Sequence, residues 1–494
     1  MRFLRVLCLV FLFLACATVG WAATELLKDV RPGIQSGNSD EFVYLKTDTY
    51  ILNGNDGVWG KELWVSDGTA SGTKLLKDIF PGQGDSDPSG LLEVGGDVVF
   101  FGADNGVAGK ELWKTDGTQA GTALVKDINP GAAASSPNWL HAAAGVVFFS
   151  ADDGVHGKEL WKTDGTDAGT VLVKDINPGA TGSTPQNLQH IGNSWEKLLF
   201  TADDGVHGRE LWVSDGTPAG TVLVKDILPG AGDGYPSDPY YPLSGMYAYF
   251  RADDGVNGKQ LWESDGTNAG TKMYLVNPAG DAFPTSMHLL GSKLIFAATD
   301  AAHGQELWSV TPGDYDGATL LKDINPGPAN GNPYAFALAD PLLVFVGNDG
   351  VHGAEPWRTD GTTAGTQMIK DINPGASDGS ISWGDMASTF FTAVFFATDG
   401  IHGAEPWVTD GWDTGTAMLQ DVCPGAAGSD PVGARFAHHR VWFRANDGVH
   451  GAEPWWTDGI VSFLTSGGGG CDGTGGSFAW LSIFPLLFVF LRRR

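Results

Sequence analysis

The chain of 494 residues carries 58 Asp and Glu residues against 30 Lys and Arg residues, which gives a formal net charge of −28 at pH 7. This charge excludes nucleic acid as a partner and disfavours anionic lipid, while cations, basic surfaces and neutral glycans remain compatible with it. Of the four cysteines, only Cys423 lies away from the chain ends. A framework of intrachain disulfides is therefore excluded, and packing must stabilise the fold.

Residues 1–22 are predicted to be a signal peptide. Met1 to Arg5 form a basic segment, an apolar run follows, and small residues precede a cleavage position after Ala22. A lipoprotein signal acylated at Cys16 is the competing interpretation, but Leu14 lies one place too close to that cysteine for a good acylation motif. The sequence thus predicts export, and a fold that begins near residue 24.

The body of the chain is a tandem repeat. A tryptophan in a Glu-Leu-Trp or Glu-Pro-Trp context, with one Gln-Leu-Trp variant, recurs at spacings of 46 to 51 residues, at Trp64, Trp113, Trp161, Trp212, Trp262, Trp308, Trp357, Trp407 and Trp455. In the third copy, β-rich runs such as Val146–Ala151 alternate with Asp-Gly and Pro-Gly turns. Four short antiparallel strands per copy are typical of a propeller blade. We therefore predict an all-β fold, a β-propeller of about nine four-stranded blades over residues 24–462.

The first and last copies are incomplete in complementary ways. Glu25–Gly33 corresponds to the last strand of a repeat, and the final copy, which ends near Gly459, lacks that strand. An N-terminal strand that completes the last blade would close the ring and remove two open sheet edges. This predicts Lys28 opposite Glu453. Two smaller tandem propellers, or an open array, are the alternatives, with a seam at the degenerate sixth copy.

The hairpin at the end of each repeat predicts an ion pair. If Thr163 faces Thr170 across the intervening turn, antiparallel pairing places Glu159 opposite Lys174. The fifth copy loses both charges together, as expected for a cross-strand pair, because a partly buried charge without its partner is costly. We predict that Glu159 and Lys174 are structural partners. The tryptophans of the repeat are predicted to pack between blades.

The repeat resembles a bacterial family of exported proteins named for its Glu-Leu-Trp-x-x-Asp-Gly-Thr repeats. Five copies carry the full Leu-Trp core with the threonine, at Trp64, Trp113, Trp161, Trp212 and Trp262. The resemblance spans residues 24 to 460. It implies an exported protein of this class and supplies no mechanism.

The C-terminal segment resembles the tripartite sorting signals of Gram-negative surface proteins. A Gly-rich linker at 463–477 contains Cys471, and an apolar anchor at 478–494 ends in three arginines. The resemblance implies processing or lipidation at Cys471 by envelope sorting machinery. It also implies display at the cell surface, with at least transient attachment to the membrane through the tail. An uncleaved membrane anchor is the alternative.

The Asp-Asp-Gly-Val-His-Gly turn between the second and third strands is the most polar recurring loop, and it is expected on the same rim as the Asn-Pro-Gly turn. Its carboxylates are weak candidates for Ca²⁺ ligands, the only cofactor considered: Asp152, Asp153, Asp203 and Asp204. The alternative is that these aspartates bond the amides of their own turns. His156 and His207 are candidate ligand-binding residues, each too far from its equivalents to share a metal. The Asp-Gly-Thr turn is expected to be capped similarly on the opposite rim.

A Tyr- and Pro-rich insertion at 233–242 is the longest departure from the repeat, and it adds Tyr235, Tyr240 and Tyr241 as candidate ligand-binding residues. No nucleophile elbow, phosphate-binding loop or zinc-protease motif occurs, so no catalytic residue is assigned. The sequence predicts a surface propeller for adhesion or scaffolding, without enzymatic activity, that binds an extracellular glycan or protein. The alternative is a propeller hydrolase or lyase that acts on polysaccharide.

Overall fold

The computed structural model describes residues 24–458 except 38, 40, 47, 193–195, 243–246, 380–386, 389–390 and 438–439. The predicted signal peptide, the linker with Cys471 and the apolar anchor lie outside the described residues. In the part of the chain that is described, no helix has the length and apolar character needed to cross a membrane.

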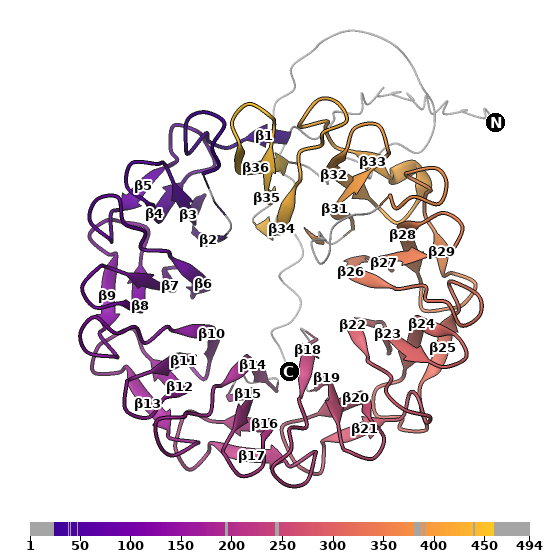
Figure 1. Cartoon of the computed structure of the whole chain (residues 1–494), viewed down its shortest axis with the longest axis horizontal. Coiled ribbons are helices and arrows are strands. Elements are labelled where there is room, and N and C mark those ends of the chain that lie inside the picture. The colour runs from indigo at the N-terminus through magenta and orange to yellow at the C-terminus, as the bar shows by residue number, and fades with distance from the viewer. Residues whose placement is uncertain are drawn as a thin grey trace, which may run out of the picture. The chain divides into compact units, whose positions relative to one another are not determined.

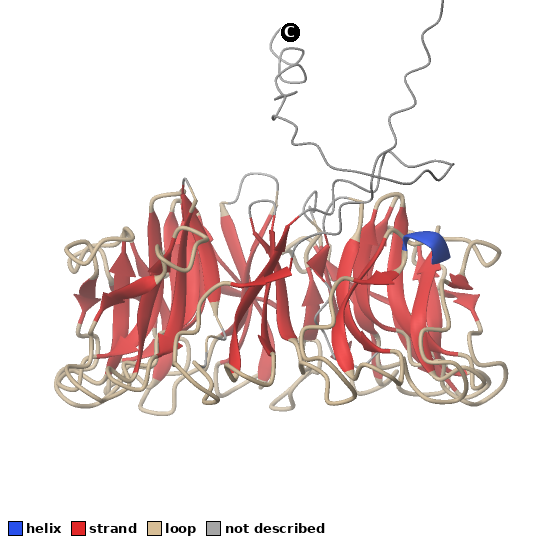
Figure 2. Ribbon diagram, turned by 90° about the horizontal axis from the view of Figure 1, so that it is seen from above, coloured by secondary structure: helices blue, strands red, loops and turns tan. Residues whose placement is uncertain are grey.

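Nine four-stranded antiparallel sheets are arranged around a common axis (Figure 1). In blade one the strands run outward from the axis in chain order, as β2 (Phe42–Lys46), β3 (Thr49–Asn55), β4 (Lys61–Ser66) and β5 (Lys74–Lys77). The predicted propeller of nine blades is confirmed. Seen from the side, loops cover both edges of the blades (Figure 2).

The remaining blades repeat this order. Blades two to four contain β6 (Ser89–Val94), β7 (Val98–Asp104), β8 (Lys110–Thr115), β9 (Ala123–Lys126), β10 (Asn138–Ala143), β11 (Val146–Asp152), β12 (Lys158–Thr163), β13 (Val171–Lys174), β14 (Gln186–Ile191), β15 (Lys197–Asp203), β16 (Arg209–Ser214) and β17 (Val222–Lys225). Blades five and six contain β18 (Ser237–Tyr240), β19 (Ala248–Asp253), β20 (Lys259–Ser264), β21 (Lys272–Tyr274), β22 (Thr285–Leu290), β23 (Lys293–Asp300), β24 (Gly304–Val310) and β25 (Thr319–Lys322).

Blades seven to nine contain β26 (Tyr334–Ala339), β27 (Leu342–Asn348), β28 (Ala354–Thr359), β29 (Gln367–Met368), β30 (Ala387–Ser388), β31 (Ala393–Thr398), β32 (Ala404–Thr409), β33 (Ala417–Met418), β34 (Val432–Ala437), β35 (Arg440–Asn446) and β36 (Ala452–Asp458). The outer strand of blade nine is β1 (Thr24–Leu26), and a short 3-10 helix, η1 (Asp413–Gly415), lies between β32 and β33.

The hydrophobic core lies between neighbouring blades. Trp161 of blade three is 6% exposed and packs in one cluster with Phe100 and Leu112 of blade two. Both faces of each sheet are covered in this way. This explains why buried and exposed residues do not alternate along β11, which has five consecutive buried residues. The prediction that the repeat tryptophans pack between blades is confirmed, since each is at most 7% exposed.

The N-terminal strand closes the ring. β1 pairs with β36 in a register that places Thr24 opposite Thr457 and Leu26 opposite Trp455. The junction is packed like the others, with the rings of Tyr50 and Trp442 centred 4.4 Å apart. Blade six is also complete, and its Ile295 packs with Phe345 and Trp357 of blade seven. The structure therefore has no seam at the sixth copy, and the single ring replaces the alternative of two tandem propellers.

The predicted ion pairs are wrong because the outer strand contains a β-bulge. Trp161 lies opposite Leu172, but Leu160 lies opposite Lys174, so the register shifts by one residue between them. Glu159 is therefore not the partner of Lys174. At the ring closure, the Leu27 amide donates to the Pro454 carbonyl at 2.9 Å.

The lysines join neighbouring blades instead. Lys174 Nζ donates to the Thr221 carbonyl at 2.8 Å and lies 5.7 Å from the centre of the Trp212 ring. Lys28 Nζ likewise reaches across the closure, to the Ala70 carbonyl of blade one at 3.1 Å, and is not bonded to Glu453. Lys174 thus binds a carbonyl and an aromatic face, and Lys28 a carbonyl, rather than the predicted glutamates.

Candidate functional site

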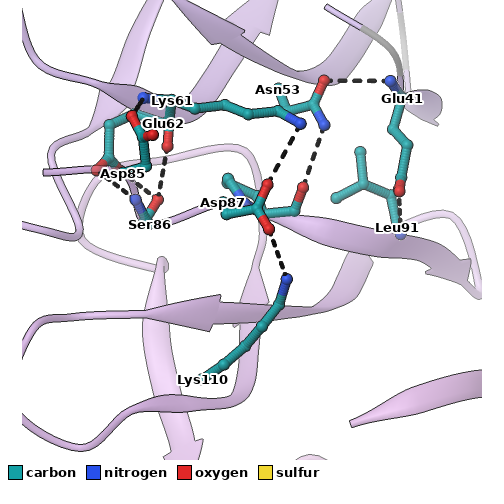
Figure 3. Close-up of polar contacts among 10 residues, drawn as sticks. Glu41, Asn53, Lys61, Glu62, Asp85, Ser86, Asp87, Leu91 and Lys110 are labelled. Carbon is teal, nitrogen blue, oxygen red and sulfur yellow. Dashed lines mark hydrogen bonds and ion pairs between the residues drawn. The ribbon is translucent and has the colours of Figure 1, made fainter. Parts of the chain in front are cut away.

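A buried glutamate holds one rim loop in every blade but the fifth. In blade one, Glu62 is fully buried and accepts hydrogen bonds from the Ile79 and Phe80 amides at 2.9 and 3.1 Å. It also accepts from Ser86 Oγ at 2.6 Å (Figure 3). Burial raises the pKa of Glu62 to about 7. The equivalent buried glutamates are Glu111, Glu159, Glu210, Glu306, Glu355, Glu405 and Glu453. These carboxylates organise the connection to the next blade.

Blade five uses a neutral amide for the same purpose. Gln260 Oε1 accepts from the Val276 and Asn277 amides at 2.9 and 3.1 Å, while its Nε2 donates to carbonyls that include Gly280 at 2.8 Å. The side-chain oxygen of Gln260 thus accepts the loop amides as the glutamates do. Its side-chain nitrogen needs acceptors that the glutamates do not need, and the loop carbonyls supply them. A negative charge is therefore not needed to fold this loop.

The polar turn between the second and third strands is capped by its own aspartates. Asp152 Oδ1 accepts from the Gly154 amide at 2.8 Å, and Asp153 Oδ1 accepts from the Val155 and His156 amides at 2.9 and 2.8 Å. His156 Nδ1 lies 2.7 Å from Asp153 Oδ2, and this hydrogen bond raises the pKa of His156. The carboxylates predicted as candidate calcium ligands thus accept hydrogen bonds from the backbone of their own turn.

Blade four repeats this arrangement. Asp203 Oδ1 accepts from the Gly205 amide at 2.7 Å, Asp204 Oδ1 from the His207 amide at 2.8 Å, and His207 Nδ1 lies 2.8 Å from Asp204 Oδ2. Within the described ranges, no group of three or more His, Cys, Asp or Glu residues is arranged to hold a metal ion. Calcium binding stays a prediction.

The Asp-Gly-Thr turns are capped in the same manner. Asp164 Oδ1 accepts from the amide and from Oγ1 of Thr166 at 2.8 and 2.7 Å, and these bonds lower the pKa of Asp164. The hydroxyls of Thr163 and Thr170 lie 2.7 Å apart across the hairpin. These turns join the third and fourth strands. Both kinds of turn repeat around the ring, so neither marks one place in it.

The predicted tyrosine segment supplies part of the innermost strand of blade five. Tyr235 is 56% exposed in the loop before β18, whereas Tyr240 ends β18 and Tyr241 follows it. Both later tyrosines are partly buried, and Tyr241 Oη donates to the Asn187 carbonyl of blade four at 3.4 Å. The structure therefore separates Tyr235 from the other two tyrosines and places its backbone near the turn that contains His207, where the Tyr235 amide donates to the Arg209 carbonyl at 3.3 Å.

Two histidines meet on the inner strands of blades three and four. His141 Nε2 lies 3.1 Å from His190 Nδ1 and accepts the His190 backbone amide at 3.0 Å, and the imidazole rings are stacked with centroids 5.4 Å apart. This pattern assigns the lone pair of His141 to Nε2 and the proton of His190 to Nδ1. Burial lowers the pKa of His141 to about 4 and also lowers the pKa of His190.

A tyrosine and a histidine form the next contact around the axis. Tyr240 Oη accepts the Leu289 amide of blade six at 3.0 Å, and the Tyr240 ring lies 5.5 Å from that of His288. Burial raises the pKa of Tyr240 and lowers that of His288. We call His141, His190, Tyr240 and His288 the inner-strand row. At neutral pH its imidazoles are uncharged proton acceptors, and its phenol is a protonated donor.

The histidines of this row were missed by sequence reasoning. His141 and His190 lie 49 positions apart, one repeat length, on segments that otherwise read as weak strands. The six rim histidines drew attention because they share a motif, whereas the row histidines stand in no motif. Their spacing of one repeat was the signal that could have identified them as neighbours.

No protein-family model and no curated protein matches this chain. Among solved structures, a prolyl endopeptidase matches at 12% identity and a TM-score of 0.38, over 76% of this chain and 55% of that chain. A puromycin hydrolase matches at 14% and 0.36, over 72% and 58% of the two chains. Oligopeptidase B from Leishmania major matches at 12% and 0.39, over 76% and 54%.

The chain thus spans a little over half the length of these solved structures. Likeness of this degree carries no substrate or catalytic residue over to this protein. The matched proteins are enzymes by name, which contradicts the prediction of an adhesion or scaffold propeller without catalytic activity. That prediction is not retained.

Proposed function

We propose that the protein is a polysaccharide-cleaving enzyme that works by proton transfer, with His288 as base and Tyr240 as acid. The observation that supports this is the contact between these two rings, centred 5.5 Å apart. They belong to the inner-strand row, which departs from the repeat in blades three to six, whereas the rim turns recur from blade to blade. Active sites characteristically depart from the symmetry of the scaffold that carries them. The row also places its titratable groups in the protonation states that a base and an acid require.

Eliminative cleavage suits these groups. His288 Nδ1 donates to the Leu289 carbonyl at 3.0 Å, which leaves the lone pair of the ring on Nε2. This nitrogen takes the proton beside the carboxylate of a uronic acid unit, a carbon–carbon double bond forms, and the bond to the leaving sugar oxygen breaks. Tyr240 Oη donates the proton that the leaving oxygen needs. Hydrolysis would instead use two carboxyl groups on either side of the bond, and the four residues of the row include none.

The negative charge of the chain should affect its activity on an anionic polymer. At −28, the protein repels an anionic polymer at long range, and salt screens that repulsion. We therefore expect kcat/KM on a uronate polymer to rise with ionic strength. On the sequence of residues 1–22, we also propose that this activity is exported.

Incubation with polygalacturonate and alginate, with xylan as a neutral comparison, tests the function. We expect the ultraviolet absorbance of the new double bond to rise in step with reducing ends on a uronate polymer. His288→Gln and Tyr240→Phe should each lower kcat by about 100-fold or more. His156→Gln, in a rim turn, should leave kcat unchanged. Reducing ends without the absorbance would contradict elimination, and the absence of cleavage on all three polymers would refute the proposal.

A further inference from the structure

The turns between second and third strands display a ring of exposed aliphatic side chains. Eight of the nine blades contribute one, and the exposed fractions run from 56% to 86%. The residues, which we call the aliphatic ring, are Val58, Val107, Val155, Val206, Val256, Val351, Ile401 and Val449. Single exposed valines need no explanation, but the same exposed position in eight blades does.

The fold does not require these side chains. Val155 contributes its amide to the turn, through the bond to Asp153 Oδ1. Blade six has Ala302 at the equivalent position, and the turn still forms, with the Ala302 and His303 amides bonded to Asp300 Oδ1 at 3.0 and 2.7 Å. The turn is therefore satisfied without an aliphatic side chain, and the eight larger residues serve a surface.

Charge divides this surface into two parts. The third strand begins with a cation in blades one to five, at Lys61, Lys110, Lys158, Arg209 and Lys259. It begins with alanine in blades seven to nine, at Ala354, Ala404 and Ala452. Blades seven to nine thus keep the aliphatic ring and the turn aspartates and lack the cation at the start of the third strand. His352, His402 and His450 remain bonded to the turn aspartates at 2.6 to 2.8 Å.

Asp87 and Asp430, which occupy equivalent positions in blades two and nine, show how the missing lysines change the surroundings of an aspartate. Asp87, just before the inner strand of blade two, lies 3.3 Å from Lys61 Nζ and 3.0 Å from Lys110 Nζ (Figure 3). Asp430 occupies the same place before the inner strand of blade nine, and both residues have a positive φ, 44° and 45°. The two positions that would supply its lysines are Ala404 and Ala452. Asp430 is exposed.

We propose that the rim of blades seven to nine is a docking surface for a basic protein segment in which cationic and apolar side chains alternate. We call this surface the acidic arc. Its apolar contacts are Val351, Ile401 and Val449, and its exposed carboxylates are Asp378 and Asp430. The side chains of the turn aspartates Asp349, Asp399 and Asp447 are only 14% to 21% exposed and are bonded to rim histidines. Charge complementarity selects the partner, since aliphatic side chains among aspartates match apolar side chains among lysines or arginines.

Other occupants fit less well. A second copy of this chain would bring another strongly acidic surface against the arc, and a bilayer with anionic lipids would be repelled in the same way. The proposal is independent of the polysaccharide activity, because the arc uses rim turns and none of the inner-strand row.

Binding of a synthetic peptide of alternating leucine and lysine to the exported protein, measured by fluorescence anisotropy, tests the arc. The matched peptides replace lysine with glutamate or leucine with serine. The arc variant is Val351→Ser, Ile401→Ser, Val449→Ser, and its control is Val107→Ser, Val155→Ser, Val206→Ser in blades whose third strand begins with a cation. All six side chains are exposed, so both variants should keep the melting midpoint of the parent.

We expect the arc variant to lose at least about tenfold in affinity and the control less than about twofold. Ala354→Lys, Ala404→Lys and Ala452→Lys together should also weaken binding, and neither matched peptide should bind tightly. Equal losses in the arc and control variants, or none in either, would overturn the proposal. The proposal would also be overturned if the peptide did not bind and the arc variant instead abolished binding to phosphatidylserine vesicles. The same holds if the peptide did not bind and the arc variant abolished self-association.

Discussion

Glu453 Oε2 accepts the backbone amide of Val30 at 3.0 Å, across 423 positions of the chain. The second carboxylate oxygen accepts the Gly37 amide at 2.7 Å. This is the same loop contact that Glu62 makes inside blade one, with the difference that here it joins the start of the fold to its end. The repeat thus uses one device both to shape a loop and to close the ring.

Substitution of this glutamate should destabilise the closure. Glu453→Ala leaves buried amides without an acceptor, and we expect a loss of about 2–4 kcal/mol in the free energy of unfolding. Glu453→Gln should cost less, because Gln260 shows that an amide oxygen can accept the equivalent bonds. Denaturant unfolding measures both, with Glu25→Ala on β1 as an exposed control. Equal losses for all three would show that the carboxylate has no special role.

Coupling energies can distinguish the contact of Lys174 with the neighbouring blade from the ion pair with Glu159 that the sequence predicted. A double-mutant cycle on Glu159→Gln and Lys174→Met should give a coupling energy of less than about 0.5 kcal/mol, because these side chains are not partners. A cycle on Lys174→Met and Trp212→Leu should give about 0.5–1 kcal/mol. The reverse order of the two coupling energies would restore the ion pair.

Stability should fall as pH rises from acid to mildly alkaline values. The pKa of Glu62, Glu210, Glu306, Glu355 and Glu453 is raised from 4.5 to about 7. The folded protein therefore holds extra protons between those values, and the stabilisation present below pH 4.5 is lost as pH rises through 7.

The rim histidines act in the same direction. Their aspartates raise the pKa of residues such as His156 and His402 above 6.5, so their contribution is also lost as pH rises through the folded-state pKa. Thermal melting should give a higher midpoint at about pH 5 than at about pH 8. A midpoint that climbs between these values would contradict the burial of the glutamates as protonated groups.

Removal of calcium should leave the melting midpoint unchanged if the turn aspartates serve only as caps. Asp153→Ala should then cost about 1 kcal/mol, as the loss of other turn and cap acceptors does. The same substitution at Asp153 measured with and without chelator separates the two roles. A midpoint that falls on chelation in the parent and not in the variant would place a calcium ion at this turn.

The repeat period, the four strands of each blade and the closure followed from the sequence because they depend on spacing and punctuation. The partners of Glu159 did not, because constant antiparallel register fails at a β-bulge, and nothing in Val173 or its neighbours announces one. The role of the Glu159 carboxylate is visible only in the structure, where it accepts the loop amides of Ile176 and Asn177.

The candidate site was predicted in part. The Tyr-rich insertion pointed to Tyr240, which does join the inner-strand row. His141, His190 and His288 were overlooked because a half-buried strand histidine resembles any other residue of a short, irregular strand. The insertion also pointed to Tyr235, which the structure leaves in an exposed loop. His141, Tyr240 and His288 share one strand position and His190 stands one residue further along its strand, so register rather than a motif relates the members of the row.

The closed ring of nine blades underlies every assignment of rim, inner strand and arc. The most direct test is a cysteine pair, Thr24→Cys with Thr457→Cys, in a Cys423→Ser background, because these two threonines are opposite partners in the β1–β36 pairing. Mass spectrometry of the oxidised monomer should find one intrachain disulfide between the two peptides. Failure of the pair to form a bridge, or bridges only between separate chains, would contradict the closure.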